Sequence, residues 1–148
     1  MKPMLDRSVL DWIADLGVTI EYTNDLPPQR LGAYLDDEKV ILIRRGLTDT
    51  LEQEALHHEY AHAFYGDRTC PPATERRAWT MVAQLMVDPL AYAQAERVSD
   101  DALFIARELG VTKRVVTAFR TLLVKLGDTT YVDARMGAGQ WLHRELVA

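Results

Sequence analysis

The chain has 148 residues and a mass of 16.8 kDa, a length that predicts one compact domain or one domain with a small helical appendage. Its composition, 48% hydrophobic and 26% charged residues, is typical of a globular protein, so neither disorder nor a disulfide scaffold is needed to explain it. The formal net charge of -5 argues against a protein that binds nucleic acid over its whole surface, although one basic face is still allowed.

The N-terminal part of the chain predicts a short helix and a small sheet. Apolar side chains recur at helical spacing from about Asp6 to Gly17, and residues 18–23 alternate apolar and polar side chains as a half-buried strand does. Two further strands are expected at 31–35 and 40–44, because the polar connection 36–39 between them suits a hairpin. We therefore expect a small, mostly antiparallel sheet of three strands.

A helix is expected from Asp49 to Gly66. Asp49 is a suitable N-cap, Glu52 three residues later completes a capping box, and a glycine commonly ends a helix. A second helix follows the break at Cys70-Pro71-Pro72, since apolar side chains recur at helical spacing until Asp88-Pro89. The sheet is expected to pack on the first of these helices, which gives an α+β fold.

The rest of the chain is expected to be helical, with amphipathic segments at about 100–109 and 112–126. Joined by Gly110-Val111, these two segments resemble a helix-turn-helix. We therefore expect a core over residues 1–95 and a C-terminal helical segment over residues 96–148 that packs on it.

One motif carries chemistry, because His58-Glu59-Tyr60-Ala61-His62 has the form His-Glu-x-x-His within the first long helix. Residues four apart lie one above the other on a helix, so His58 and His62 can bind one Zn²⁺. Glu59 lies about 100° further around the axis, where it can take the proton of a water that zinc has acidified. The alternative is a solvated helix face that carries two histidines by chance. The spacing predicts a catalytic zinc site.

A catalytic zinc ion usually has three protein ligands and one position open to water. Glu75 is our candidate for the third ligand, because it begins the next helix in line with an apolar stripe, and a buried carboxylate needs a cation. An exposed glutamate favoured by the helix dipole is the alternative. Cys70 and His143 are further candidates. His57 is expected at the surface or beside a ligand, since it lies five positions before His62.

The group that would stabilise the developing oxyanion is left open at this point. A phenol can donate the required hydrogen bond, but tyrosines near a metal helix are as often packing residues. Four tyrosines are therefore kept out of the catalytic set: Tyr34, Tyr60, Tyr65 and Tyr92.

At these residues the sequence resembles the ImmA/IrrE family of metallo-endopeptidases, which occur in phages, mobile elements and bacterial stress regulators. The resemblance covers roughly Val18 to Leu126. It rests on the strand Val40–Ile43, the motif from His58 to His62, and the segment from Glu75 to Pro89, which is similar to a family helix that opens with a glutamate ligand and closes before proline.

The resemblance implies that His58, His62 and Glu75 bind Zn²⁺ and that Glu59 is the general base. It also implies a protein substrate, a helix-turn-helix transcriptional repressor of a phage or mobile element. Other peptidases with this motif bind an extended peptide as an added strand. We expect the strand 31–35 to be the edge that receives it.

The segment 112–126 has four basic residues and no acidic one, which are Lys113, Arg114, Arg120 and Lys125. A DNA contact is conceivable, but a helix pair that closes a small core explains its apolar stripe equally well. The second hypothesis is therefore a non-catalytic, zinc-containing regulatory protein that binds a repressor or DNA through these helices. Glu59 favours the enzyme, because a structural zinc site needs ligands but no base.

The expected cellular compartment is inferred from three features: the cysteine count, the lengths of the apolar segments and the first residues of the chain. The single cysteine cannot form an internal disulfide, and no segment reaches the ~18 consecutive apolar residues of a membrane span. The first residues also lack the apolar run of a signal peptide. We expect a cytoplasmic protein that does not contact membranes.

Overall fold

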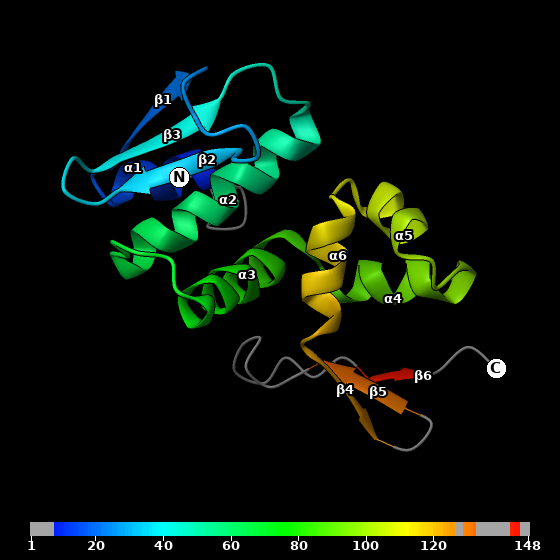
Figure 1. Cartoon of the computed structure of the whole chain (residues 1–148). Coiled ribbons are helices and arrows are strands. Elements are labelled where there is room, and N and C mark those ends of the chain that lie inside the picture. Colours follow the sequence, from blue (N-terminus) through cyan, green and yellow to red (C-terminus); the bar gives the residue numbers. More distant parts are fainter. Residues whose placement is uncertain (1–7, 127–128, 133–142, 146–148) are drawn as a thin grey trace, which may run out of the picture. The chain divides into compact units, whose positions relative to one another are not determined.

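The computed structural model describes residues 8–126, 129–132 and 143–145, and side chains up to residue 123 (Figure 1). The chain divides into two compact units, Met1–Trp79 and Thr80–Ala148. The expected boundary after residue 95 stays a prediction. None of the described helices is both long and apolar enough to cross a membrane.

The first unit contains a three-stranded sheet of β1 (Thr19–Thr23), β2 (Gly32–Leu35) and β3 (Val40–Arg44). The strand order is β1-β3-β2. β2 and β3 form the expected antiparallel hairpin, but β1 pairs with β3 in parallel. The sheet is therefore mixed, and the expectation of a mostly antiparallel sheet is wrong. The connection 24–31 carries the chain past β3, so the first and third strands run in the same direction. The α+β class is confirmed.

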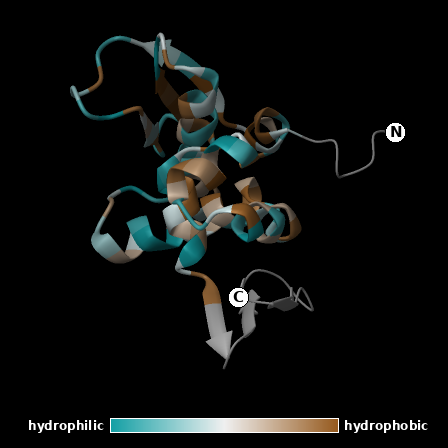
Figure 2. Ribbon diagram, turned by 90° about the vertical axis from the view of Figure 1, so that its right-hand side faces the viewer, coloured by the Kyte–Doolittle hydropathy of each residue, from teal (hydrophilic) through white to brown (hydrophobic). Residues whose placement is uncertain are grey.

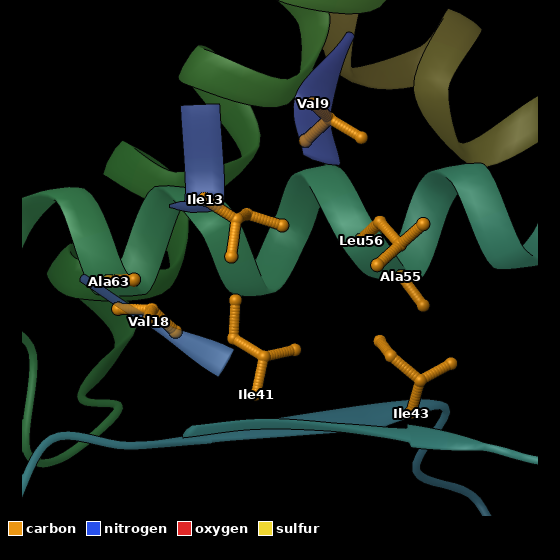
Figure 3. Packing of buried hydrophobic residues seen from close by; sticks show 8 residues of the cluster. All are labelled: Val9, Ile13, Val18, Ile41, Ile43, Ala55, Leu56 and Ala63. Carbon is orange, nitrogen blue, oxygen red and sulfur yellow. The ribbon is translucent and has the colours of Figure 1, made fainter. Parts of the chain in front are cut away.

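The core of this unit lies between β3 and two helices, α1 (Val9–Asp15) and α2 (Asp49–Tyr65). Figure 3 shows the side chains of Ile41 and Ile43 standing on the sheet and pointing toward α2. Both isoleucines are fully buried. Figure 2 shows hydrophobic stretches, in brown, alternating with hydrophilic stretches, in teal, along the strands and helices. The buried cluster comprises Val9, Ile13, Val18, Ile41, Ile43, Ala55, Leu56 and Ala63. This packing fixes α2 against the sheet.

Thr48 and Gly66 set the ends of α2. The N-cap is Thr48, whose hydroxyl accepts a hydrogen bond from the Leu51 amide at 3.4 Å, so the expected N-cap at Asp49 is one residue late. A threonine oxygen can accept a hydrogen bond from an amide of the first turn, as an aspartate can. Gly66 ends the helix as expected, with a φ of 66° in the left-handed region that favours glycine.

β2 is an edge strand, since β3 is its sole neighbour in the described sheet. The Arg44 amide donates to the Leu31 carbonyl at 2.8 Å. Hydrogen-bonded pairs alternate along an antiparallel ladder, so the next such pair joins Ala33 to β3. The amides of Gly32 and Tyr34 therefore point away from β3, toward the outer edge of the sheet.

The chain continues through α3 (Pro72–Met86), where the division between the units falls, into the second unit with α4 (Pro89–Val98), α5 (Ala102–Leu109) and α6 (Lys113–Arg120). A second sheet follows, with β4 (Leu123–Leu126), β5 (Thr129–Val132) and β6 (His143–Glu145) in consecutive antiparallel order. The expectation that this part is wholly helical, with one helix over 112–126, is therefore wrong. Leu122 and Leu126 fit helical spacing, but pairing of 123–126 with a strand rich in β-branched residues overrides that pattern.

Candidate metal centre

The helix α2 brings the two histidines of the motif together on one face. Their ring centroids lie 4.7 Å apart and the rings are nearly perpendicular. His62 is buried and 3% exposed, whereas His58 is partly exposed. The predicted one-turn relationship between His58 and His62 is therefore present in the structure.

Glu75, in the first turn of α3, reaches both histidines. Its Oε2 lies 3.1 Å from Nε2 of His58, and its Oε1 lies 2.8 Å from Nε2 of His62. The short loop between α2 and α3 is long enough to fold this glutamate back over the motif. The structure thus places Glu75 within 3.1 Å of both histidines that the sequence predicts as ligands.

The other ring nitrogen of each histidine faces a second carboxylate. Nδ1 of His58 lies 3.1 Å from Oε1 of Glu59, and Nδ1 of His62 lies 2.9 Å from Oδ2 of Asp67. When Nδ1–H donates to a carboxylate, the neutral ring presents its Nε2 lone pair on the opposite side. Both lone pairs then point at Glu75.

His62 shows that this arrangement fits a metal ion. Its Nε2 is buried and has no hydrogen-bond partner among the described residues, although Oε1 of Glu75 is 2.8 Å away, because the contact lacks hydrogen-bond geometry. Two acceptors at this distance repel each other unless a cation lies between them. Bonds of 2.0–2.2 Å to tetrahedral zinc separate two ligand atoms by about 3.3 Å, so a small outward shift of Glu75 would admit the ion.

The charges of the carboxylates already act on the metal-free site. Burial lowers the pKa of His58, but the hydrogen bond and charge of Glu59, together with the charge of Glu75, outweigh it and raise the pKa above its ordinary value. Burial raises the pKa of Glu75, but the two histidines outweigh it and bring the pKa below its ordinary value. The cluster therefore favours positive charge among its carboxylates, which a divalent cation supplies.

Sequence reasoning missed the residues that support these ligands. Asp67 accepts a hydrogen bond from Arg77 at 2.6 Å through its Oδ1, and the guanidinium of Arg77 lies 3.9 Å from the ring centroid of Tyr65. Trp79 stacks on His58 with a centroid distance of 4.8 Å. In the sequence, the signal for Asp67 is its position directly after Gly66, which ends the helix. In the structure the chain turns back at this point, and the Asp67 amide donates to the His62 carbonyl.

Glu59, the predicted general base, is 3% exposed and lies against the edge strand β2. A Cβ atom added to Gly32 would meet Cγ of Glu59 at 3.0 Å and the Leu42 carbonyl at 2.9 Å. The strand can approach the base this closely because residue 32 has no side chain.

The remaining histidines and the cysteine occupy different environments. His57 is buried and donates from Nδ1 to the Gln53 carbonyl at 2.6 Å beside Trp12, so the surface position, one of the two alternatives expected for it, is wrong. His143 lies in β6, and its side chain is outside the described part of the structure. Cys70 is exposed, but its sulfur lies within 4.8 Å of ligand atoms of His62 and Glu75.

The four tyrosines kept out of the catalytic set all have packing or hydrogen-bond contacts. The hydroxyl of Tyr34 donates to Asp36 at 2.7 Å, and Tyr60 packs against Trp12. In the second unit, Tyr92 is buried against Phe119. Tyr65 contacts the guanidinium of Arg77. Each of the four tyrosines therefore has a contact of its own in the structure.

The helix-turn-helix-like pair is present as α5 and α6, joined through Gly110 with a φ of 69°. Thr112 caps α6 as expected and accepts a hydrogen bond from the Val115 amide at 3.2 Å. Two of the four basic residues of the segment 112–126 do not form a basic helix surface, however. Arg120 donates to the Tyr92 hydroxyl at 3.0 Å and to the Asp100 carbonyl, and Lys125 lies in β4. Lys113 and Arg114 are exposed at the start of α6.

Comparison with known proteins supports the fold alone. No protein-family model matches the chain, and no curated protein matches it. Among solved structures, a Mycobacterium tuberculosis transcriptional regulator is similar, with a TM-score of 0.53 and 16% sequence identity over 92% of this chain. The match covers 49% of the regulator, so the chain spans about half the length of that structure.

Proposed function

We propose that the protein is a zinc-dependent endopeptidase that hydrolyses a peptide bond in a protein partner. His58, His62 and Glu75 hold the zinc ion, and Glu59 is the general base. The observation that carries the proposal is the convergence of both Nε2 atoms on the two oxygens of Glu75, at 3.1 and 2.8 Å. The resemblance to the ImmA/IrrE metallo-endopeptidases supports the same assignment.

The donor set suits zinc rather than a harder ion. Two imidazoles and one carboxylate are a known catalytic zinc combination, whereas Mg²⁺ and Ca²⁺ prefer sites made of oxygen. Three protein ligands leave one coordination position open to solvent or substrate. When bound there, zinc supplies Lewis-acid activation of water and of the scissile carbonyl.

The chain's own residues supply the proton transfers. Glu59 is buried and has one oxygen 3.1 Å from Nδ1 of His58. From this position its carboxylate accepts the proton of the attacking water and returns a proton to the leaving amine. A base held in place by β2 and α2 needs little rearrangement to act.

The edge strand β2 offers a place for the substrate. The amides of Gly32 and Tyr34 point to the outer edge, and Gly32 lies against Glu59. An extended peptide paired with this edge would pass beside the base, held by main-chain hydrogen bonds that do not depend on its side chains. We propose that this segment belongs to a helix-turn-helix repressor of a phage or mobile element.

A non-catalytic regulatory protein is the second candidate function. The exposed Lys113 and Arg114 at the start of α6 favour it, since a basic helix start in a helix-turn-helix-like pair suits DNA or an acidic partner. Replacing both residues with alanine distinguishes the roles. If the pair docks a substrate, cleavage of the intact partner falls while cleavage of a short peptide is unchanged. If it binds DNA, affinity for DNA falls and its salt dependence weakens.

Metal analysis followed by a cleavage assay tests the proposed activity. The purified protein is expected to hold one zinc per chain and to cleave a candidate helix-turn-helix repressor, and o-phenanthroline is expected to stop the reaction. The His62→Ala protein serves as the matched control. Full cleavage by a protein shown to be free of metal would overturn the proposal.

A further inference from the structure

Cys70 lies beside the proposed zinc ligands and has no role in the proposed chemistry. It is the only cysteine of the chain, and it occupies the loop between α2 and α3, next to Pro71. Its Sγ, one ligand atom of His62 and one oxygen of Glu75 all lie within 4.8 Å of one another. The exposed side chain can change its rotamer without disturbing a core.

His62 provides an independent indication that a cation belongs among these three groups. His62 is only 3% exposed, and its Nε2 has no hydrogen-bond partner among the described residues. That nitrogen lies 2.8 Å from Oε1 of Glu75. Three possible metal ligands of different kinds therefore lie close together, and one of them is an imidazole whose buried Nε2 has no hydrogen-bond partner among the described residues.

We propose that Cys70 is a fourth metal ligand that closes the site and keeps the enzyme latent. The inference rests on the proposed zinc peptidase function. Two imidazoles, one carboxylate and one thiolate complete the tetrahedron that zinc prefers, and four protein ligands leave no position for water. Release of Cys70 opens that position.

The exchange requires no oxidant and no bond other than the coordinate one. The thiol loses its proton to solvent when sulfur binds the metal and takes one from solvent when it leaves. The exposed position of Cys70 on a loop makes this exchange possible without unfolding α2 or α3. An arriving substrate strand or an alkylating reagent can therefore favour the open state.

Substitution of Co²⁺ for zinc detects a thiolate ligand directly. The wild-type protein loaded with Co²⁺ is expected to show the intense near-ultraviolet band of thiolate-to-cobalt charge transfer, and the Cys70→Ser protein is expected to bind one Co²⁺ without that band. Because the chain has a single cysteine, iodoacetamide labelling reports on this residue alone. We expect zinc to slow the labelling several-fold relative to the chelator-treated protein.

The outcomes separate the two proposals. One bound Co²⁺ without the band, and labelling unaffected by zinc, would overturn the role of Cys70 and leave the zinc site intact. Absence of stoichiometric Co²⁺ or Zn²⁺ binding by the wild-type protein would overturn the proposed function as well. Latency has its own readout, since Cys70→Ser is expected to cleave a reporter peptide faster than the wild type. Equal rates would contradict it.

Discussion

Asp67 contacts the imidazole of His62 on the side opposite Nε2, with its Oδ2 2.9 Å from Nδ1 of His62. The carboxylate is in turn held by Arg77, at 2.6 Å from its other oxygen. A carboxylate behind a ligating histidine fixes the ring orientation and the tautomer, so that Nε2 keeps its lone pair for the metal. The sequence places both supporting residues outside the motif, one in the loop after α2 and one in α3.

Replacing Asp67 with alanine is expected to weaken zinc binding by about 10–100-fold, the usual effect of losing such a partner. The two histidines and Glu75 remain, so the site should still bind metal, with lower affinity. Competition with a chromophoric chelator measures the change. Asp37→Ala is the matched control, because Asp37 is 80% exposed and pairs with Arg68. Equal zinc affinity in both variants would remove Asp67 from this role.

In the Cys70→Ser background, which removes the thiolate, Glu75→Ala and His62→Ala are each expected to lose stoichiometric zinc, because only two of the three proposed ligands remain in either protein. Elemental analysis of the purified proteins gives the zinc content of each. Glu38→Ala is a suitable control, since Glu38 is an exposed glutamate of the hairpin turn. Full zinc content in Glu75→Ala with loss in His62→Ala would show that the third ligand is another residue.

Gly32→Ala is expected to slow peptide hydrolysis while the zinc content stays at one per chain. The new methyl group would lie 3.0 Å from Cγ of Glu59 and 2.9 Å from the Leu42 carbonyl, so the base or the strand must move. Overpacking of this kind costs about 1–3 kcal/mol of unfolding free energy. Urea unfolding and steady-state kinetics measure the two effects. Unchanged stability and unchanged kcat would show that this close approach has no functional consequence.

Tyr34→Pro tests the pairing of substrate with the edge strand, because it removes an amide that points away from β3. Tyr34→Ala is the matched control, since it removes the same side chain and its hydrogen bond to Asp36 but keeps the amide. KM for a reporter peptide is expected to rise in the proline variant beyond its value in the alanine variant. Identical KM values in the two folded variants would place the substrate elsewhere.

The local parts of the candidate site were predictable because they depend on helix geometry. The spacing of His58 and His62 sets their shared face, and Gly66 ends the helix. Glu75 was found from its place at the start of an apolar stripe, and the structure brings it to both rings. These inferences need one helix and its immediate continuation.

The errors concern relationships that sequence periodicity does not contain. The parallel pairing of β1 with β3 depends on the path of the connection 24–31. The strand at 123–126 has apolar residues compatible with both a helix and a strand, and its pairing with β5 decides the outcome. Arg120 belongs to the basic residues of the segment 112–126, but its guanidinium bonds to Tyr92 and Asp100. Each depends on a distant partner.

The central claim is that this chain uses Glu59 to hydrolyse peptides at a zinc site, and Glu59→Gln tests it most directly. Glutamine keeps the shape of the side chain but cannot accept the proton of the attacking water. Wild-type and variant proteins, each with its zinc content measured, are compared on an internally quenched peptide library. The account predicts one zinc per chain in both proteins and cleavage by the wild type alone. Cleavage at the wild-type rate by the zinc-loaded Glu59→Gln protein would contradict it.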